Sequence, residues 1–276
     1  MDRGHIFWAV FGAAAADAVG AAFEGLMPDD TRVPAMTGGG QFSLAAGEVT
    51  DDTLMMLVLL ETYAEAGCFS REVFFPKMIQ TIRENPKTFG NTTRRLASLV
   101  EQGCSPESAA AVIDRLFGSR TNGSVMRTLP VGLTAVSAEA ADAEARRVSA
   151  FTHLDVAAQD ACAAVSSAVY SLLHGASKET VLAAVPRQYL EGELYPSVDA
   201  VESTRCAFCI FRDADGYLDA VTRACRLGGD TDTIGAIVGG LCGALYGYDA
   251  VLAEWADMLL IKDRLETVIT RIWGKL

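Results

Sequence analysis

Several segments of this chain are apolar on every side of a helix, and this property restricts the fold more than any other feature. Residues 54–60 are all large and apolar, and residues 6–16 carry no charge. A helix of this kind has no polar face to turn toward solvent, so it belongs inside the protein. The chain has 276 residues, of which 50% are hydrophobic, which is enough for one large core or two small ones.

Helix signals recur from end to end, whereas strand alternation and hairpin signals are missing from the sequence. The connecting segments 25–50, 118–133 and 226–232 are rich in glycine, proline, asparagine and threonine. We therefore predict an all-α fold, a single domain over residues 1–276 in which central helices are wrapped by others. The predicted helices cover residues 4–22, 53–66, 71–84, 91–103, 106–117, 139–150, 154–174, 198–211, 216–226, 233–245 and 249–270.

The net charge indicates which partners to expect, and the cysteines indicate whether disulfides form. The net charge is −12 and the isoelectric point about 4.7, so nucleic acid and anionic membranes are not expected partners. The seven cysteines are odd in number and lie mostly in apolar runs, which is typical of reduced core thiols in the cytoplasm. Cys206 and Cys209 have the spacing of a redox or zinc pair, but their apolar flanks favour a helix core.

The N-terminal segment resembles a secretory signal because Arg3 and His5 precede the uncharged run 6–16. That run is too short to span a membrane, which takes about 20 residues. Asp17 and Glu24 continue the segment with helical spacing. We therefore expect a buried first helix, no membrane insertion and a cytoplasmic protein.

Two short acidic clusters carry the strongest chemical signal. Residues 50–53 read Thr-Asp-Asp-Thr and lead into an apolar helix, and residues 230–233 read Asp-Thr-Asp-Thr after two glycines. Aspartate is common at helix N-termini, so ordinary capping explains either cluster alone. Together they also fit a metal site, and oxygen ligands favour Mg²⁺, Mn²⁺ or Ca²⁺ over zinc. The spacing does not match an EF-hand, and the residues by themselves leave capping and metal binding open.

Further polar groups gather in the loops without an evident structural role. Residues 121–127 combine hydrogen-bond donors with a flexible glycine, and residues 90–93 open a predicted helix whose N-terminus suits a phosphate. The glycines at 38–40 permit close approach of a ligand to the backbone. His153 also opens a helix, although a single histidine is more often structural than catalytic.

These blocks follow one another in an order and spacing that resemble the ADP-ribosylglycohydrolase family, and within it the dinitrogenase reductase-activating glycohydrolase type. A lone Thr-Asp-Asp-Thr is a weak signal, but ordered blocks along almost the whole chain are a strong one. The blocks that carry the resemblance are residues 16–20 with Glu24, 36–40, 47–53, 90–92, 122–127, 152–153 and 228–233.

The resemblance implies an orthogonal bundle of about a dozen helices and a centre with two divalent cations, Mg²⁺ or Mn²⁺. The implied metal ligands are Thr50, Asp51, Asp52, Asp230, Asp232 and Thr233. The implied catalytic acids are Glu24, which reaches the site from the end of the first helix, Asp51, Asp52 and Asp232. The implied ADP-ribose pocket contains Gly38, Gly39, Gly40, Asn91, Asn122, Gly123, Ser124, Met126, Arg127 and His153.

The implied reaction is hydrolysis of the glycosidic bond at ribose C1″, which releases ADP-ribose from a modified side chain, first of all arginine. The expected partners are an ADP-ribosylated protein or small ADP-ribosyl substrate, and we expect a monomer. One departure concerns the acceptor: the activating type continues with Asn-His-Pro where this chain has Leu154-Asp155-Val156. Another ADP-ribosyl linkage therefore stays open as an alternative, such as an O-glycoside, a small guanidine or a modified base. A non-catalytic ADP-ribose binder is the third interpretation.

Overall fold

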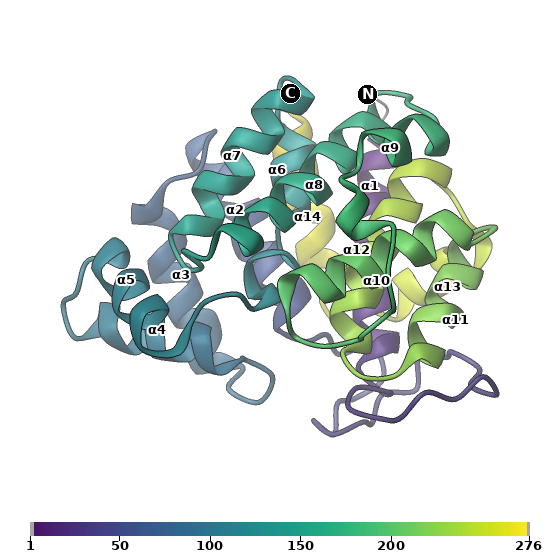
Figure 1. The fold of residues 1–276 in the computed structure, drawn as a ribbon, viewed down its shortest axis with the longest axis horizontal. Coiled ribbons are helices and arrows are strands. Elements are labelled where there is room, and N and C mark those ends of the chain that lie inside the picture. Colours follow the sequence, from purple (N-terminus) through teal and green to yellow (C-terminus); the bar gives the residue numbers. More distant parts are fainter. Residues whose placement is uncertain (1–2, 275–276) are drawn as a thin grey trace.

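The computed structural model describes residues 3–274, and every regular element in that range is helical, which confirms the all-α prediction (Figure 1). Fourteen α-helices and two short 3₁₀ turns make up the described chain. The α-helices are α1 (Arg3–Gly20), α2 (Asp51–Ala66), α3 (Arg71–Glu84), α4 (Asn91–Glu101), α5 (Pro106–Phe117), α6 (Leu129–Thr134), α7 (Ala138–Ala150), α8 (Val156–Leu173), α9 (Lys178–Ala184), α10 (Ala200–Asp213), α11 (Tyr217–Leu227), α12 (Thr231–Tyr246), α13 (Ala250–Met258) and α14 (Lys262–Trp273).

Three differences separate the predicted helices from the observed ones. The segment 118–133, predicted as a loop, contains the start of α6 at Leu129, and α9 lies in a segment for which no helix is predicted. The predicted helix 249–270 is two helices, because the chain breaks after α13 and the backbone N–H of Leu260 donates to the carbonyl of Gly47. Short helices and breaks of this kind depend on tertiary contacts, which a window of sequence does not contain.

Helices α1 and α12 form the central pair of the fold, and glycine is what allows them to pack so closely. A Cβ atom on Gly239 would lie 2.3 Å from the carbonyl oxygen of Gly12 and 2.6 Å from the Cβ of Ala16. The backbones therefore touch directly, as small residues at a helix interface permit. Tyr217 of α11 closes one side of the pair by donating a hydrogen bond to the carbonyl of Gly12 at 2.9 Å.

The apolar helices lie in the interior, as their sequences predict. Residues 51–60 of α2 are all buried, and α1 is buried over most of its length. In the part of the chain that the structure describes, α8 alone is long and apolar enough to cross a membrane, and 56% of it is buried inside the protein. The pair Cys206 and Cys209 lies within α10 with both residues buried, and all seven cysteines are free thiols.

Candidate active site

The N-termini of α2 and α12 and the segment that follows α1 meet at a cavity of about 320 Å³. Five carboxylates line this cavity, and no lysine or arginine within residues 3–274 does. The two acidic clusters predicted from the sequence are therefore brought together in one place. Both clusters sit at helix N-termini, where the helix dipole favours negative charge. The carboxylates are those of Glu24, Asp51, Asp52, Asp230 and Asp232.

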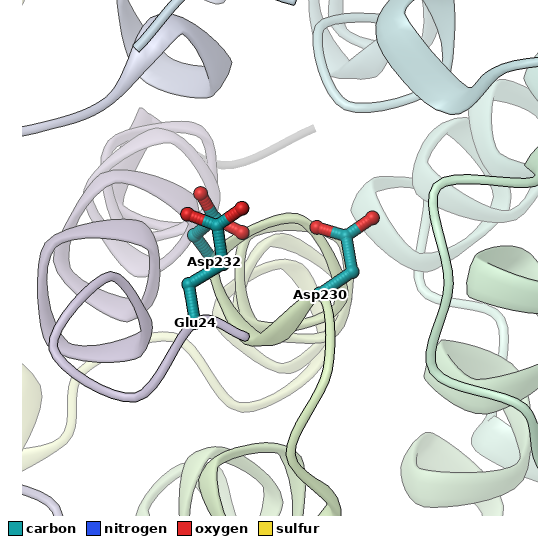
Figure 2. A group of neighbouring side chains, drawn as sticks. All are labelled: Glu24, Asp230 and Asp232. Carbon is teal, nitrogen blue, oxygen red and sulfur yellow. The ribbon is translucent and has the colours of Figure 1, made fainter. Parts of the chain in front are cut away.

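Glu24, Asp230 and Asp232 form the tightest group, since each offers an oxygen within 4.8 Å of the others. Figure 2 shows Glu24 arriving from the segment after α1, while Asp230 and Asp232 come from the start of α12. Paired backbone hydrogen bonds bring the two segments together: Gly25 N–H donates to the Gly229 carbonyl, and Gly229 N–H donates to that of Leu26. Glu24 is thereby fixed beside the glycine turn that precedes α12.

Asp17 supports the acidic cluster at residues 50–53, although it does not line the cavity and is not among the site residues predicted from the sequence. It is fully buried in α1, and its carboxylate accepts from the backbone N–H and the hydroxyl of both Thr50 and Thr53. These bonds join α1 to the start of α2 and fix the backbone that carries Asp51 and Asp52. A single acid in an otherwise uncharged run, residues 6–22, is the sequence signal that identifies such a residue.

Burial and mutual repulsion raise the pKa of most of these acids. Loss of solvation, followed by the charge of Asp17, raises the pKa of Asp51 to about 7, and burial raises the pKa of Asp17 to about 6. The pKa values of Asp52 and Asp232 lie well above their usual range, first because of burial and then because of neighbouring carboxylates. Burial also raises the pKa of Glu24. Carboxylates crowded and buried in this way are stabilised in their charged form by a nearby positive charge.

The same residues fit a divalent cation. Two buried carboxylate oxygens, Oδ1 of Asp52 and Oε2 of Glu24, have no hydrogen-bond partner in the described structure. Buried polar atoms are normally paired, so an orphaned carboxylate oxygen at an acidic cavity fits a site that could hold a cation. Hard oxygen donors gathered in this way are the ligand set that Mg²⁺, Mn²⁺ and Ca²⁺ prefer.

Of the two threonines predicted as metal ligands, Thr233 lines the cavity beside the carboxylates and Thr50 does not. Thr50 is the N-cap of α2, and its hydroxyl donates to Asp17 at 2.7 Å and accepts from the backbone N–H of Asp52. Thr50 is not among the residues that line the cavity.

The rest of the cavity wall is made of uncharged side chains and helix ends. Asn91 stands at the start of α4, and Asn122 donates a hydrogen bond from Nδ2 to Oδ2 of Asp230 at 2.6 Å. Gly123, Met126 and His153 complete the part of this wall that the sequence analysis placed in the substrate pocket. Five of the ten residues predicted for substrate binding therefore line the cavity.

The other five lie behind or beside the cavity. Ser124 is buried and is hydrogen-bonded to Ser149 and Cys162, and Arg127 is buried beneath the loop that contains Gly123. Gly38, Gly39 and Gly40 form a turn whose three φ angles are positive. A Cβ atom on Gly40 would lie 2.2 Å from the carbonyl of Ala21, so this turn packs against the end of α1.

Comparison with known proteins agrees with this architecture over almost the whole chain. A family model described as ADP-ribosylglycohydrolase matches residues 3–276. The ADP-ribosylarginine hydrolase Tri1 of Serratia proteamaculans (strain 568) is 29% identical over 96% of this chain and 78% of its own length. The ADP-ribosyl-[dinitrogen reductase] glycohydrolase of Rhodospirillum rubrum is 27% identical over 94% of this chain and 91% of its own. A solved chain described as an ADP-ribosylglycohydrolase-related protein complex superposes with a TM-score of 0.84 at 27% identity, covering 99% of this chain and 98% of that one.

Proposed function

Because this chain belongs to the ADP-ribosylglycohydrolase family, and is therefore a glycohydrolase enzyme, we propose that it removes ADP-ribose from arginine side chains with the help of two divalent cations, Mg²⁺ or Mn²⁺. The observation that carries the proposal is the cavity lined by five carboxylates and no cationic side chain of the described residues. A site this acidic repels an anionic ligand such as ADP-ribose unless cations neutralise it.

The two acidic clusters divide the ligand set between them. Asp51 and Asp52 hold the cations from α2, and Asp230, Asp232 and Thr233 hold them from α12. Thr50 is the sixth proposed ligand, and its hydroxyl is turned toward Asp17 in this structure. Bound cations supply positive charge that orients ribose hydroxyls and water and offsets the charge developing in the transition state.

The chain's own residues then perform binding, orientation and proton transfer. The proposed catalytic residues are Glu24, Asp51, Asp52 and Asp232. One of these carboxylates acts as general base and accepts the proton of the attacking water; the water oxygen bonds to C1″ as the C1″–N bond breaks, and the proton passes to the departing guanidine. Asn91, Asn122, Gly123, Met126 and His153 form the wall against which ADP-ribose binds.

Arginine as the acceptor is supported by the names of the relatives, two of which are ADP-ribosylarginine hydrolases. The segment Leu154-Asp155-Val156 favours a second candidate, the hydrolysis of another ADP-ribosyl linkage. Asp155 caps α8 by accepting from the backbone N–H of Ala157 at 2.8 Å, and Val156 is 66% exposed. No polar side chain other than the capping Asp155 stands in these three positions to recognise a leaving group.

The test is release of ADP-ribose from an ADP-ribosyl-arginine peptide in the presence of Mn²⁺ or Mg²⁺, with and without EDTA. We expect activity to depend on the cation and to fall at least a hundredfold in Asp51→Asn and Asp232→Asn, about the loss typical of a removed catalytic group. Asp249→Asn is the matched control, because Asp249 only caps α13. Equal rates after chelation contradict the proposal.

A substrate panel separates the two candidates. It contains peptides with ADP-ribose on arginine and on serine, ADP-ribosylated free guanidines and an ADP-ribosylated base. Preference for arginine supports the first candidate, and preference for any other linkage supports the second. ADP-ribose binding by calorimetry without turnover of any member indicates a non-catalytic binder instead.

A further inference from the structure

Arg127 is a buried cation without a carboxylate partner within residues 3–274. The residue is 1% exposed and its Nε has no hydrogen-bond partner. Its two terminal nitrogens donate to the carbonyl of Gly123, at 2.8 Å, and to the hydroxyl of Thr152. The guanidinium also lies over the ring of Phe74, 5.5 Å from its centre. A buried charge is costly, so this arrangement needs a role that offsets the cost.

The hydroxyl of Thr152 lies between Arg127 and His153 and is hydrogen-bonded to both. A guanidinium only donates hydrogen bonds, so Thr152 accepts from Arg127 and keeps one proton to donate. Two acceptors compete for that proton: Nδ1 of His153 at 2.8 Å and the carbonyl of Ser149 at 3.3 Å. The Thr152 oxygen could also accept a second hydrogen bond, from an Nδ1–H of His153, while its proton goes to Ser149. The shorter contact favours the other arrangement, in which Thr152 donates to Nδ1.

His153 consequently carries its own proton on Nε2. Burial, followed by the charge of Arg127, lowers the pKa of His153 to about 3, so the ring is neutral at working pH. With Nδ1 accepting, the neutral ring has its hydrogen on Nε2, which lies 3.1 Å from the hydroxyl oxygen of Thr121. Thr121 therefore accepts from His153, and its own proton points elsewhere.

Thr121 lines the active-site cavity, and its remaining neighbour is the hydroxyl of Thr92 at 3.5 Å, at the limit of a hydrogen bond. We propose that Arg127 and Thr152 are positioning residues that fix the Nε2–H tautomer of His153 and thereby make the Thr121 hydroxyl a hydrogen-bond donor into the cavity. Such a donor fits an oxygen acceptor on the ligand. That the ligand is ADP-ribose rests on the proposed function, whereas the tautomer does not.

The first experiment reads the tautomer directly, by ¹⁵N NMR of the histidine rings in the wild-type protein at about pH 8, where unperturbed histidines are neutral. The other two histidines serve as internal references. Nδ1 of His5 faces the carbonyl of Ala244 at 2.9 Å and Nδ1 of His174 faces that of Tyr170 at 2.7 Å, so both donate from Nδ1. We expect two Nδ1–H rings and one Nε2–H ring, the last absent from His153→Gln. An Nδ1–H ring at His153 overturns the proposal.

The second experiment tests the effect on binding, with ADP-ribose as the probe in calorimetry with Mn²⁺ present. Thr152→Val removes the hydroxyl and keeps the shape, and we expect Kd to rise about tenfold, the effect of one hydrogen bond. Thr152→Ser keeps the hydroxyl and should restore Kd to within about threefold of wild type. Thr204→Val is the matched control, since Thr204 is equally buried and its hydroxyl has no partner.

The two experiments fail in distinguishable ways. An unchanged Kd in Thr152→Val overturns the positioning role, even if wild type hydrolyses ADP-ribosyl-arginine as proposed. If wild type does not bind ADP-ribose, the proposed function fails, but the NMR result still decides the tautomer. If Thr152→Val does not fold, the Thr152→Ser protein takes its place: an Nε2–H ring at His153 with near-normal Kd supports the relay, and an Nδ1–H ring refutes it.

Discussion

Replacing Asp232 by asparagine should stabilise the metal-free protein while abolishing its activity. Asp232, Asp230 and Glu24 each have an oxygen within 4.8 Å of the others. Two unit charges at that distance repel by about 3.5 kcal/mol at an effective dielectric constant of about 20. Asp232 takes part in two such pairs, so neutralising it relieves both. Its raised pKa means that protonation already relieves part of the repulsion. We therefore expect a net gain of about 2 to 4 kcal/mol in unfolding free energy at about pH 8.

Asp232→Asn preserves the local geometry, so its effect on stability can be attributed to the loss of charge. Oδ1 of Asp232 accepts from the backbone N–H of Thr233 at 2.9 Å, and an amide oxygen in the same place accepts equally well. The amide nitrogen then faces the remaining carboxylates as a donor. Asparagine and aspartate also have similar helix-start preferences, so the start of α12 is not weakened.

The assay is urea unfolding of wild type, Asp232→Asn and Asp249→Asn, each with EDTA and with Mn²⁺. With EDTA, Asp232→Asn should unfold at higher urea than wild type, and Asp249→Asn should match wild type because that residue only caps α13. With Mn²⁺, wild type should gain stability and Asp232→Asn should gain much less. Equal or lower stability of Asp232→Asn in EDTA, with an unaffected control, refutes the idea that these carboxylates repel one another.

Two further predictions concern pH and helix packing. The folded-state pKa values of Asp17 and Asp51, about 6 and about 7, exceed the unfolded value of 3.8, so the stability they contribute is fully present below about pH 3.8 and lost as pH rises through 6 and 7. Urea unfolding with EDTA at pH 5 and pH 8 should show a loss of about 1.4 kcal/mol from Asp17 alone, because about one pH unit separates pH 5 from its folded pKa of about 6, and a flat profile contradicts this. Gly239→Ala should lower the unfolding free energy by about 1 to 3 kcal/mol and lower activity, because its Cβ would lie 2.3 Å from the carbonyl oxygen of Gly12. Gly274→Ala is the control: the nearest atom to its Cβ would be 3.6 Å away, so this variant should match wild type in thermal unfolding.

The sequence predicts the helices and the acidic clusters well because both are local patterns. Uninterrupted apolar runs such as 54–60 belong in the interior, and that segment is buried in α2. Paired acids at two helix starts are visible in the sequence, but ordinary capping also explains each pair, and only the structure brings both pairs to one cavity. The break between α13 and α14 was not predictable in the same way, since it depends on a hydrogen bond from Leu260 to the distant Gly47.

The sequence motif at residues 122–127 does not predict which of its side chains point into the cavity. Residues 122–127 form one continuous block, yet Asn122, Gly123 and Met126 line the cavity while Ser124 and Arg127 turn into the interior. The chain reverses through a 3₁₀ turn at 122–124, so neighbours in the sequence face opposite ways. A motif therefore identifies a segment that belongs to the site without saying which of its side chains touch the ligand.

Asp17 of the block 16–20 and Arg127 of the block 122–127 do not line the cavity, and both hold neighbouring residues in place by hydrogen bonds. Each is a buried residue: Asp17 contacts the segment that carries Asp51 and Asp52, and Arg127 contacts the segment that carries Gly123. Asp17 accepts from Thr50 and Thr53, and Arg127 donates to Gly123 and Thr152, so the two segments are fixed with opposite polarity. An ionised carboxylate can only accept, so the hydroxyls of Thr50 and Thr53 both donate to Asp17, and a guanidinium can only donate, so the hydroxyl of Thr152 accepts from Arg127. Charge buried one layer behind the cavity thereby orders the uncharged groups around it.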